Sequence, residues 1–199
     1  MARRLLGCVL VRIMPDGTRL AGEIVETEAY IGPEDRASHA QGGRRTPRNE
    51  PMWSLPGTSY VYFTYGMHYC MNVACYRVDH PAAVLLRALR PLEGLKTMAL
   101  HRAGGAAKQA AAIPARDLCR GPARLCQALA IARAETGTDT VTSDALFFER
   151  PPRPRRLAIL TTPRIGVLSA GPQWSAAPLR FVIQGSPWAS GVARLNAGA

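Results

Sequence analysis

Apolar and polar residues alternate near the start of the chain with the two-residue period of a β-strand. The segments Leu5–Ile13 and Leu20–Tyr30 are apolar or alternating, and the turn sequence Pro15–Thr18 lies between them. This pattern predicts a β-hairpin. A signal peptide is the less favoured interpretation, because Arg12 interrupts the first apolar run and no small-residue cleavage site follows it.

The second strand of this hairpin carries closely spaced carboxylates. Strict alternation places one set of side chains on a single face of the strand: Ile24, Glu26, Glu28 and Tyr30. The opposite face then holds Val25, Thr27 and Ala29. A carboxylate such as Glu28, next to Tyr30 on that face, is partly removed from water, which raises its pKa towards that of a useful general base. The alternative is that Glu26 or Glu28 is simply an exposed strand residue.

The rest of the chain shows strand and helix patterns that do not alternate regularly. A long polar loop, Ile31–Met52, comes first, and loops of this length are usually functional or disordered. The later apolar runs predict further strands: from Pro56–Thr58 through Tyr65, Met71–Cys75, Ala83–Leu89, Arg164–Leu168 and Leu179–Ile183. Two helices are predicted, from Pro91 to about His101 and from Gly121 to about Ala132. This order favours one α+β domain over residues 1–199, with a curved, largely antiparallel sheet and flanking helices.

Three segments lie outside these elements. Residues 103–115 are rich in alanine and glycine, and residues 150–156 are basic and proline-rich, so we expect two mobile loops. Residues 191–199 form a tail. No apolar run is long enough to cross a membrane.

The balance of charge predicts an anionic partner. The 199 residues carry a formal net charge of +11 and give a pI of about 10.2, which favours nucleic acid first and a membrane surface second. Nearly all of the excess is arginine, since Lys96 and Lys108 are the only lysines, and arginine binds phosphates and stacks on bases better than lysine. A GC-rich genome would also favour arginine, but it would not produce the net charge.

Aromatic, acidic and basic residues gather in one part of the sequence. Residues Tyr60–Asn72 contain four of the six tyrosines, and they follow the acidic strand Val25–Tyr30 and the arginine-rich loop Gly42–Arg48. Flat rings, a desolvated carboxylate and guanidinium groups suit an enzyme that takes a nucleobase out of a duplex, stacks it and cleaves its glycosidic bond.

Within this region the candidate general base is Glu28. Cleavage of a nucleoside N–C1′ bond passes through an oxocarbenium-like state, so one carboxylate can activate water and stabilise the developing positive charge. Tyr30, His39 and Tyr62 are candidate stacking surfaces, and each stacked base contributes about 1–3 kcal/mol. The alternatives are a tyrosine-rich sheet core and a structural histidine.

Two further features are candidates for contacts with DNA. Tyr65–Met67 ends a strand at a glycine, so its turn would project a ring and a methionine that can fill a gap in a base stack. A plain β-turn is the alternative. A set of arginines would contact phosphates, although any single one could lie on a solvated face: Arg44, Arg45, Arg48 and Arg87.

The chain resembles the alkyladenine (3-methyladenine) DNA glycosylase family from its first strand to its last. The resemblance consists of motifs in a fixed order: Ile24–Tyr30, Gly32–Asp35, His39, Gly42–Gly43, Thr46–Asn49, Pro56–Thr58, Tyr60–Tyr62, Tyr65–Met67, Cys70–Asn72, Val84–Ala88, Pro91–Gly94, Gly121–Pro122, Leu125–Ile131, Pro163–Gly166 and Pro178–Phe181. It implies a single α+β domain around an antiparallel sheet, working without a metal or an organic cofactor.

The resemblance also implies roles for individual residues. Glu28 would activate the water, and Arg87 would hold that site and the adjacent phosphate. Asn72 would clash with the 2-amino group of guanine and so protect normal purines. The base pocket would be lined by Tyr30, His39 and Tyr62. Tyr65 would enter the minor groove in place of the extruded nucleotide. Together with the candidates from the turn and the arginine-rich loop, the predicted DNA-binding residues are Tyr65, Met67, Arg44, Thr46 and Arg48.

The chain departs from the family pattern at two places. It begins at Ala2–Leu6 where family members usually have extra residues, so residues 1–4 look like a truncated start. His68 and Tyr69 stand where we expect an aromatic pair. His68 would alter the pH dependence of DNA binding, or it faces solvent without a role.

These observations predict a monomeric, monofunctional DNA glycosylase that flips alkylated or deaminated purines out of double-stranded DNA and hydrolyses the N-glycosidic bond. Water is the expected nucleophile, because Lys96 and Lys108 lie outside the matched active-site motifs. Such a protein would be cytoplasmic, with the DNA, or nuclear in a eukaryote. No metal site is expected, because the five cysteines form no CxxC pair and the four histidines form no HExxH or HxH.

Two other functions compete with this prediction. A non-catalytic nucleic-acid-binding protein would use the same basic, aromatic surface, but Glu28 and Arg87 are both present. A transferase acting on nucleotides or charged tRNA has less support, because neither GxxxxGK[ST] nor GxGxxG occurs. The sequence does not rank 3-methyladenine, 7-methylguanine, hypoxanthine and ethenoadenine as substrates.

Overall fold

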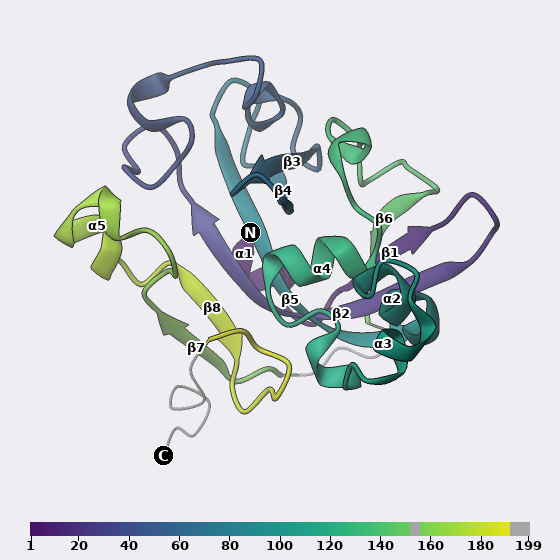
Figure 1. The fold of residues 1–199 in the computed structure, drawn as a ribbon. Coiled ribbons are helices and arrows are strands. Elements are labelled where there is room, and N and C mark those ends of the chain that lie inside the picture. Colours follow the sequence, from purple (N-terminus) through teal and green to yellow (C-terminus); the bar gives the residue numbers. More distant parts are fainter. Residues whose placement is uncertain (152–155, 192–199) are drawn as a thin grey trace.

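An antiparallel sheet lies at the centre of the molecule, and short helices pack against it (Figure 1). The computed structural model describes residues 1–151 and 156–191, and within these ranges the sheet has eight strands. Six follow the order β3-β4-β5-β2-β1-β6, while β8 pairs with β2 and β7 with β8. The strands are β1 (Val9–Ile13), β2 (Arg19–Tyr30), β3 (Ser59–Thr64), β4 (His68–Cys75), β5 (Ala82–Glu93), β6 (Leu146–Glu149), β7 (Ile159–Thr162) and β8 (Arg180–Ile183). The predicted α+β class and curved antiparallel sheet are confirmed.

The helices are short and cover the sheet where its core is largest. In the described residues they are α1 (Ala2–Leu5), α2 (Leu95–Arg102), α3 (Ala107–Ala111), α4 (Pro122–Ala128) and α5 (Pro172–Ala176). Helix α4 contacts β4, β5 and α2. Its buried Leu125 belongs to the same apolar cluster as Ile24 of β2 and Leu86 of β5, and each such side chain contributes about 1.5–3 kcal/mol on burial. This core holds the two long central strands in place.

Strand β2 changes its neighbour along one edge. Residues 19–23 pair with β1, and residues 26–28 pair with β8. On the other edge the register with β5 shifts between Ile24 and Glu26, which is a β-bulge at the point of the change. Because both edges are paired and helix α1 contacts the strand, Glu26 and Glu28 have no exposed surface. The prediction of partial desolvation therefore understated the burial of Glu28.

The first strand begins later than predicted. Residues Ala2–Leu5 form helix α1, and the strand starts at Val9. The helix is held against the sheet by a hydrogen bond of 3.1 Å, which the Thr27 hydroxyl donates to the Ala2 carbonyl. The predicted turn is confirmed, since the amide of Met14 bonds to the carbonyl of Thr18 at 2.9 Å.

The predicted helix start at Pro91 is wrong. Pro91 lies inside β5 opposite Gly22, beside a shift in register where the strand does not need a regular ladder of amide donors. The helix starts at Leu95, after Gly94 with a φ of 74°. A Cβ at Gly94 would lie 2.4 Å from Leu20 Cδ2, so only glycine fits this close approach. The second predicted helix ends early, at Ala128, because Ala130 turns the chain with a φ of 50°.

The strand predicted over Arg164–Leu168 is also wrong. The strand that pairs with β8 is Ile159–Thr162, and Pro163 ends it. The following loop turns at Gly166, which has a φ of 80°, and it hydrogen-bonds to buried carboxylates instead of to a neighbouring strand.

Some elements of the structure are not predicted by the sequence patterns. Helix α3 lies within residues 103–115, and β6 and α5 are also absent from the predictions. Residues 152–155 of the predicted basic loop and 192–199 of the predicted tail lie outside the described residues. The mobility of both predicted loops stays a prediction. Among the residues that the structure describes, none of the helices has the length and apolarity needed to span a bilayer.

Candidate active site

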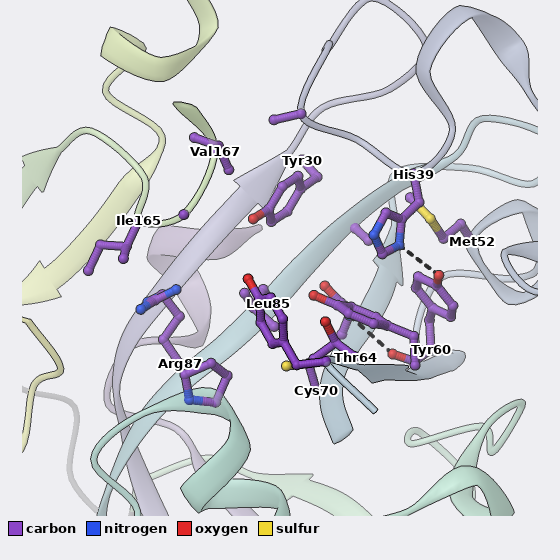
Figure 2. Close-up of a pocket in the computed structure, with 17 residues that line it drawn as sticks. Tyr30, His39, Met52, Tyr60, Thr64, Cys70, Leu85, Arg87, Ile165 and Val167 are labelled. Atoms are coloured by element: carbon purple, nitrogen blue, oxygen red, sulfur yellow. Dashed lines mark hydrogen bonds between the residues drawn. The ribbon is translucent and has the colours of Figure 1, made fainter. Parts of the chain in front are cut away.

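A cavity of about 250 Å³ opens beside the β3–β4 hairpin, where the ends of β2 and β5 meet two loops (Figure 2). It is lined by Tyr30, Ala37, His39, Met52, Tyr60, Tyr62, Thr64, Tyr65, Cys70, Asn72, Ala83, Leu85, Arg87, Pro122, Ile165, Gly166 and Val167. The structure thus brings together six of the residues that the sequence singled out: Tyr30, His39, Tyr62, Tyr65, Asn72 and Arg87. The residues Glu28, Met67, Arg44, Thr46 and Arg48 do not line the cavity.

One wall of the cavity is a cluster of aromatic rings. Nδ1 of His39 lies 2.8 Å from the Tyr60 hydroxyl, and its ring meets Tyr62 edge-on at 4.6 Å between centroids. Burial, together with the nearby charge of Arg48, lowers the pKa of His39 to about 4. His39 is therefore a neutral ring at neutral pH, with a flat face and no charge to hydrate.

Asn72 lies on β4 beside this wall. It is 4% exposed, and its amide nitrogen donates a hydrogen bond of 3.2 Å to the carbonyl of Tyr60, its partner on β3. The pairing of β4 with β5 places it opposite Leu85. The side-chain amide is thereby held in one orientation at the cavity wall.

Glu28 lies behind the cavity surface and touches three groups around it. Its Oε1 accepts a hydrogen bond of 2.8 Å from the amide of Ile165 and lies 3.2 Å from Nη1 of Arg87. Its Oε2 accepts a hydrogen bond of 3.0 Å from the Tyr30 hydroxyl. Burial raises the pKa of Glu28, and it outweighs the opposite effects of Arg87, Ile165 and Tyr30. Burial and the neighbouring Glu28 also raise the pKa of Tyr30, so its hydroxyl keeps the proton that it donates.

A second carboxylate, Glu26, fixes the arginine from the other side. Its Oε1 accepts hydrogen bonds from Nε of Arg87 at 2.9 Å and from Nε of Arg180 at 2.7 Å. The Ser190 hydroxyl also donates to Oε1, and the Ser190 amide donates to Oε2. Nη2 of Arg87 donates to the Ser190 hydroxyl at 3.1 Å. All three nitrogens of Arg87 thus have protein partners, and the residue is 7% exposed. Its contact with a DNA phosphate stays a prediction.

A separate buried ion pair joins the two loops beside the cavity. Nη1 and Nη2 of Arg164 bind Oδ2 and Oδ1 of Asp35 at 2.6 and 2.8 Å, and both side chains have no exposed surface. The guanidinium carbon also lies 4.7 Å from the centroid of the Tyr30 ring. Neither residue has a predicted role, because the pattern around Arg164 predicts a strand and Asp35 lies in a long polar loop. The motifs Gly32–Asp35 and Pro163–Gly166 were the available signals.

The rim of the cavity is exposed, in contrast with its floor. Tyr65 is 84% exposed and Met67 is 67% exposed. The hairpin pairs Thr64 with His68, so Tyr65, Gly66 and Met67 form its turn. Tyr65 has a φ of 51°, a conformation that a bulky residue seldom adopts. The turn therefore projects two large side chains into solvent, of which Tyr65 lines the mouth of the cavity and Met67 does not.

The predicted arginine loop lies near this rim. Arg44, Arg45 and Arg48 are all exposed. Arg45 forms ion pairs with Glu50 and Asp79. Nη2 of Arg48 donates to the carbonyl of Phe63 at 3.3 Å, and its guanidinium lies 5.5 Å from the Tyr62 ring centroid. Thr46 Oγ1 donates to Asn49 Oδ1 at 3.2 Å, so Thr46 stabilises the turn of the loop.

Some lining residues had no predicted role. Cys70, Ile165 and Val167 also line the cavity. In Figure 2, Cys70 lies between Arg87 and Tyr60, and Ile165 and Val167 lie on the other side of Tyr30 from His39. Cys70 and Ile165 belong to motifs of the resemblance, which was a usable signal, but hydrophobic patterns alone do not separate such residues from the core. Within residues 1–151 and 156–191, no three histidine, cysteine, aspartate or glutamate side chains are grouped so as to hold a metal ion.

Comparisons with known proteins identify relatives over nearly the whole chain. The family model for methylpurine-DNA glycosylase (MPG) matches residues 1–187. The DNA-3-methyladenine glycosylase of Homo sapiens is 50% identical over 200 residues, which cover 98% of this chain and 65% of the human protein. The corresponding proteins of Mus musculus and Rattus norvegicus are 48% and 47% identical, each over 98% of this chain and over 59% and 61% of their own length. The chain therefore spans roughly three fifths of the length of these relatives.

Proposed function

The chain belongs to the methylpurine-DNA glycosylase family, and we propose that it excises alkylated or deaminated purines from double-stranded DNA by hydrolysing the N-glycosidic bond. The observation that carries this proposal is the buried carboxylate of Glu28, held by Arg87 directly behind a cavity with an aromatic wall. A base with a raised pKa beside a slot for a flat ring is what water attack at C1′ requires.

In this proposal Glu28 activates the water. A carboxylate has about four acceptor positions, and three are used by the amide of Ile165, Nη1 of Arg87 and the Tyr30 hydroxyl. We assign the remaining position, on Oε2, to the attacking water, which has to enter from the cavity side because Glu28 has no exposed surface. The ionised carboxylate then accepts a proton from that water while its charge stabilises the oxocarbenium-like state. Arg87 keeps the carboxylate oriented and balances its charge.

The aromatic wall would hold the extruded base. Tyr30, His39 and Tyr62 offer ring faces, and a neutral His39 stacks without the cost of removing a charge from water. Stacking accepts any base, so selectivity has to come from elsewhere. The fixed amide of Asn72 would crowd the 2-amino group of guanine and so disfavour normal guanine in the cavity.

The exposed rim would bind the duplex. Tyr65 would fill the space left by the extruded nucleotide, Met67 would lie beside it, and the charges of Arg44 and Arg48 would neutralise phosphates. Thr46 would keep the arginine loop in shape and contact the backbone. We propose that a monomer is the active unit and that the protein works with the DNA, in the cytoplasm of a bacterium or the nucleus of a eukaryote.

The test is excision from defined duplexes. Purified protein is incubated with duplexes that carry 3-methyladenine, 7-methylguanine, hypoxanthine or ethenoadenine, and alkali then cleaves the abasic sites. The wild-type protein should release at least one lesion, Glu28→Gln should release none at a comparable rate, and Glu93→Gln, a change at an exposed carboxylate away from the cavity, should match the wild type.

Two controls separate the competing functions. Borohydride should trap no covalent adduct, since an adduct would mean that an amine and not water attacks C1′. Tight binding to damaged duplexes without excision of any lesion by the wild-type protein would instead identify a non-catalytic DNA-binding protein.

A further inference from the structure

We propose that the buried ion pair of Asp35 and Arg164 positions both the Tyr30 hydroxyl and the Ile165 amide, and that it thereby orients the carboxylate of Glu28. Its role in catalysis rests on the proposed function, and its role in holding the two loops does not. The pair would be a positioning element, because neither residue lines the cavity.

The first step is the position of Arg164 between the two donors. Apart from Arg87, the groups that bind Glu28 are the Tyr30 hydroxyl and the Ile165 amide. Arg164 stacks on the Tyr30 ring at 4.7 Å and immediately precedes Ile165 in the chain. Arg164 therefore contacts the ring that carries one donor through its guanidinium, and its backbone is joined to the other donor by the Arg164–Ile165 peptide bond.

The second step is the rigidity of the pair. The guanidinium fork binds both oxygens of Asp35, and Nη1 also donates to the carbonyl of Ala29 at 2.9 Å. Asp35 in turn accepts hydrogen bonds from the amides of Ala37 at 3.0 Å and Ile31 at 3.3 Å, which shapes the loop that leads to His39. A planar fork on a carboxylate fixes direction as well as distance.

The third step is the cost of disturbing the pair. Both side chains are fully buried, so loss of one partner leaves a buried charge without its counter-ion, and the loops have to move to hydrate it. Such a movement displaces Ile165 and Tyr30 from Glu28. A displacement of about 1 Å at a reacting group costs up to about 100-fold in rate.

A pH profile distinguishes positioning from plain stability. Both donors lower the pKa of Glu28 against the dominant effect of burial, so their loss moves the acid limb of the rate profile to higher pH. The other charged or titratable groups around Glu28 lie on four strands, and the test does not change them: Glu26 on β2, Cys70 on β4, Arg87 on β5 and Arg180 on β8.

The test compares Arg164→Lys with Arg12→Lys. Arg12 forms a part-buried pair with Glu135 at 2.7 Å, and neither of these residues lines the cavity. Lysine keeps the charge at both positions and removes the planar fork. The first measurement is hydrogen exchange of the Ile165 amide, which requires no activity. The second is single-turnover excision of ethenoadenine and hypoxanthine as a function of pH.

Arg164→Lys should lose protection at Ile165, slow excision by about 10-fold or more and shift the acid limb to higher pH, while Arg12→Lys should lower the melting temperature without any of these changes. Asp35→Asn should repeat the Arg164→Lys result from the other side of the pair. Unchanged Ile165 protection or an unshifted acid limb in a folded Arg164→Lys protein would overturn the proposal. Lost protection in a protein whose wild type excises no base would overturn the proposed function and still support the linkage of the loops.

Discussion

Arginines lie at and behind the floor of the cavity and also beside its rim, in opposite surroundings. On the floor side each arginine is buried against a carboxylate: Arg87, Arg164 and Arg180 against Glu26, Glu28 and Asp35. On the rim side the arginines are exposed: Arg44, Arg45 and Arg48. The three buried arginines and three buried carboxylates balance to a formal charge of zero, so the net charge of +11 is carried by the rest of the chain.

This difference teaches which arginines can serve which purpose. Buried pairs are screened little by salt and depend steeply on geometry, whereas exposed charges act over a distance and weaken as salt is added. The amino-acid composition does not distinguish buried arginines from exposed ones. We therefore expect changes on the floor to affect chemistry and folding, and changes on the rim to affect binding to DNA.

The largest expected effect concerns the floor. Glu28→Gln keeps the shape of the side chain and removes the carboxylate that we propose as the general base, so single-turnover excision should fall by about 10²–10⁴-fold. Binding to a damaged duplex should change little. Single-turnover kinetics and a binding titration check this, with Glu93→Gln as the matched control. Near-normal excision by Glu28→Gln would falsify the assignment of the base.

The next largest effect compares folding stability on the two sides. Arg180→Ala leaves Glu26 buried with one ion-pair partner fewer and should lower the free energy of unfolding by about 3–5 kcal/mol. Arg48→Ala should change it by no more than about 0.5 kcal/mol. Urea unfolding of both variants checks the contrast. Equal losses would show that burial does not separate the two classes.

The predicted pH dependence of excision follows from the buried carboxylate of Glu28. Because burial raises the pKa of Glu28, the ionised base forms only at a pH above that of an ordinary carboxyl, and the rate should fall about tenfold per pH unit below that pKa. The same sign makes folding stability decrease as the pH rises through the folded pKa, and Glu28→Gln should remove this decrease. Rate profiles and unfolding at several pH values measure both. An acid limb at the pH of a free carboxylate would contradict the prediction.

Selectivity should also divide between the two sides. Asn72→Ser at the cavity wall should raise excision of undamaged guanine relative to hypoxanthine, which lacks the 2-amino group, by about tenfold or more. Tyr65→Ala on the rim should slow excision of every lesion in similar proportion. It removes the side chain proposed to fill the gap in the base stack and leaves the Asn72 amide unchanged. Single-turnover rates on guanine, hypoxanthine and ethenoadenine duplexes compare the two. If Asn72→Ser left the ratio of guanine to hypoxanthine excision unchanged, the residue that rejects guanine would have to lie elsewhere in the cavity.

The smallest effect is electrostatic. Arg48→Ala should reduce the slope of log K against log salt by about 0.9, the value for one phosphate contact, and should weaken damaged and undamaged duplexes alike. Binding titrations at several salt concentrations measure the slope. A loss confined to damaged DNA would make Arg48 part of lesion recognition.

Sequence reasoning reached the local parts of this arrangement and missed the contacts between distant segments. The hairpin at Pro15–Thr18 and strand β2 follow from alternation, and β5 follows from its apolar run. The helix predicted at Pro91 failed because a proline also suits an irregular strand, and the pattern does not say which edge lacks a partner. Within the site, Tyr30, His39 and Tyr62 could be predicted as a set. The pair of Asp35 and Arg164 could not, because 129 residues separate them and no local period connects them.

The hydrogen bonds between Glu26 and Ser190 place the assembly of the site late in folding. Strand β2 is synthesised early, yet its carboxylate closes a loop of 164 residues when it meets Ser190, and contacts of such separation form slowly. A nascent chain that ends before Ser190 leaves the carboxylate of Glu26 without the hydroxyl and amide of Ser190, and Arg180 without the Ser190 carbonyl. The oriented carboxylate of Glu28, which Arg87 contacts together with Glu26 and Ser190, therefore depends on a contact that forms only after Ser190 has been synthesised.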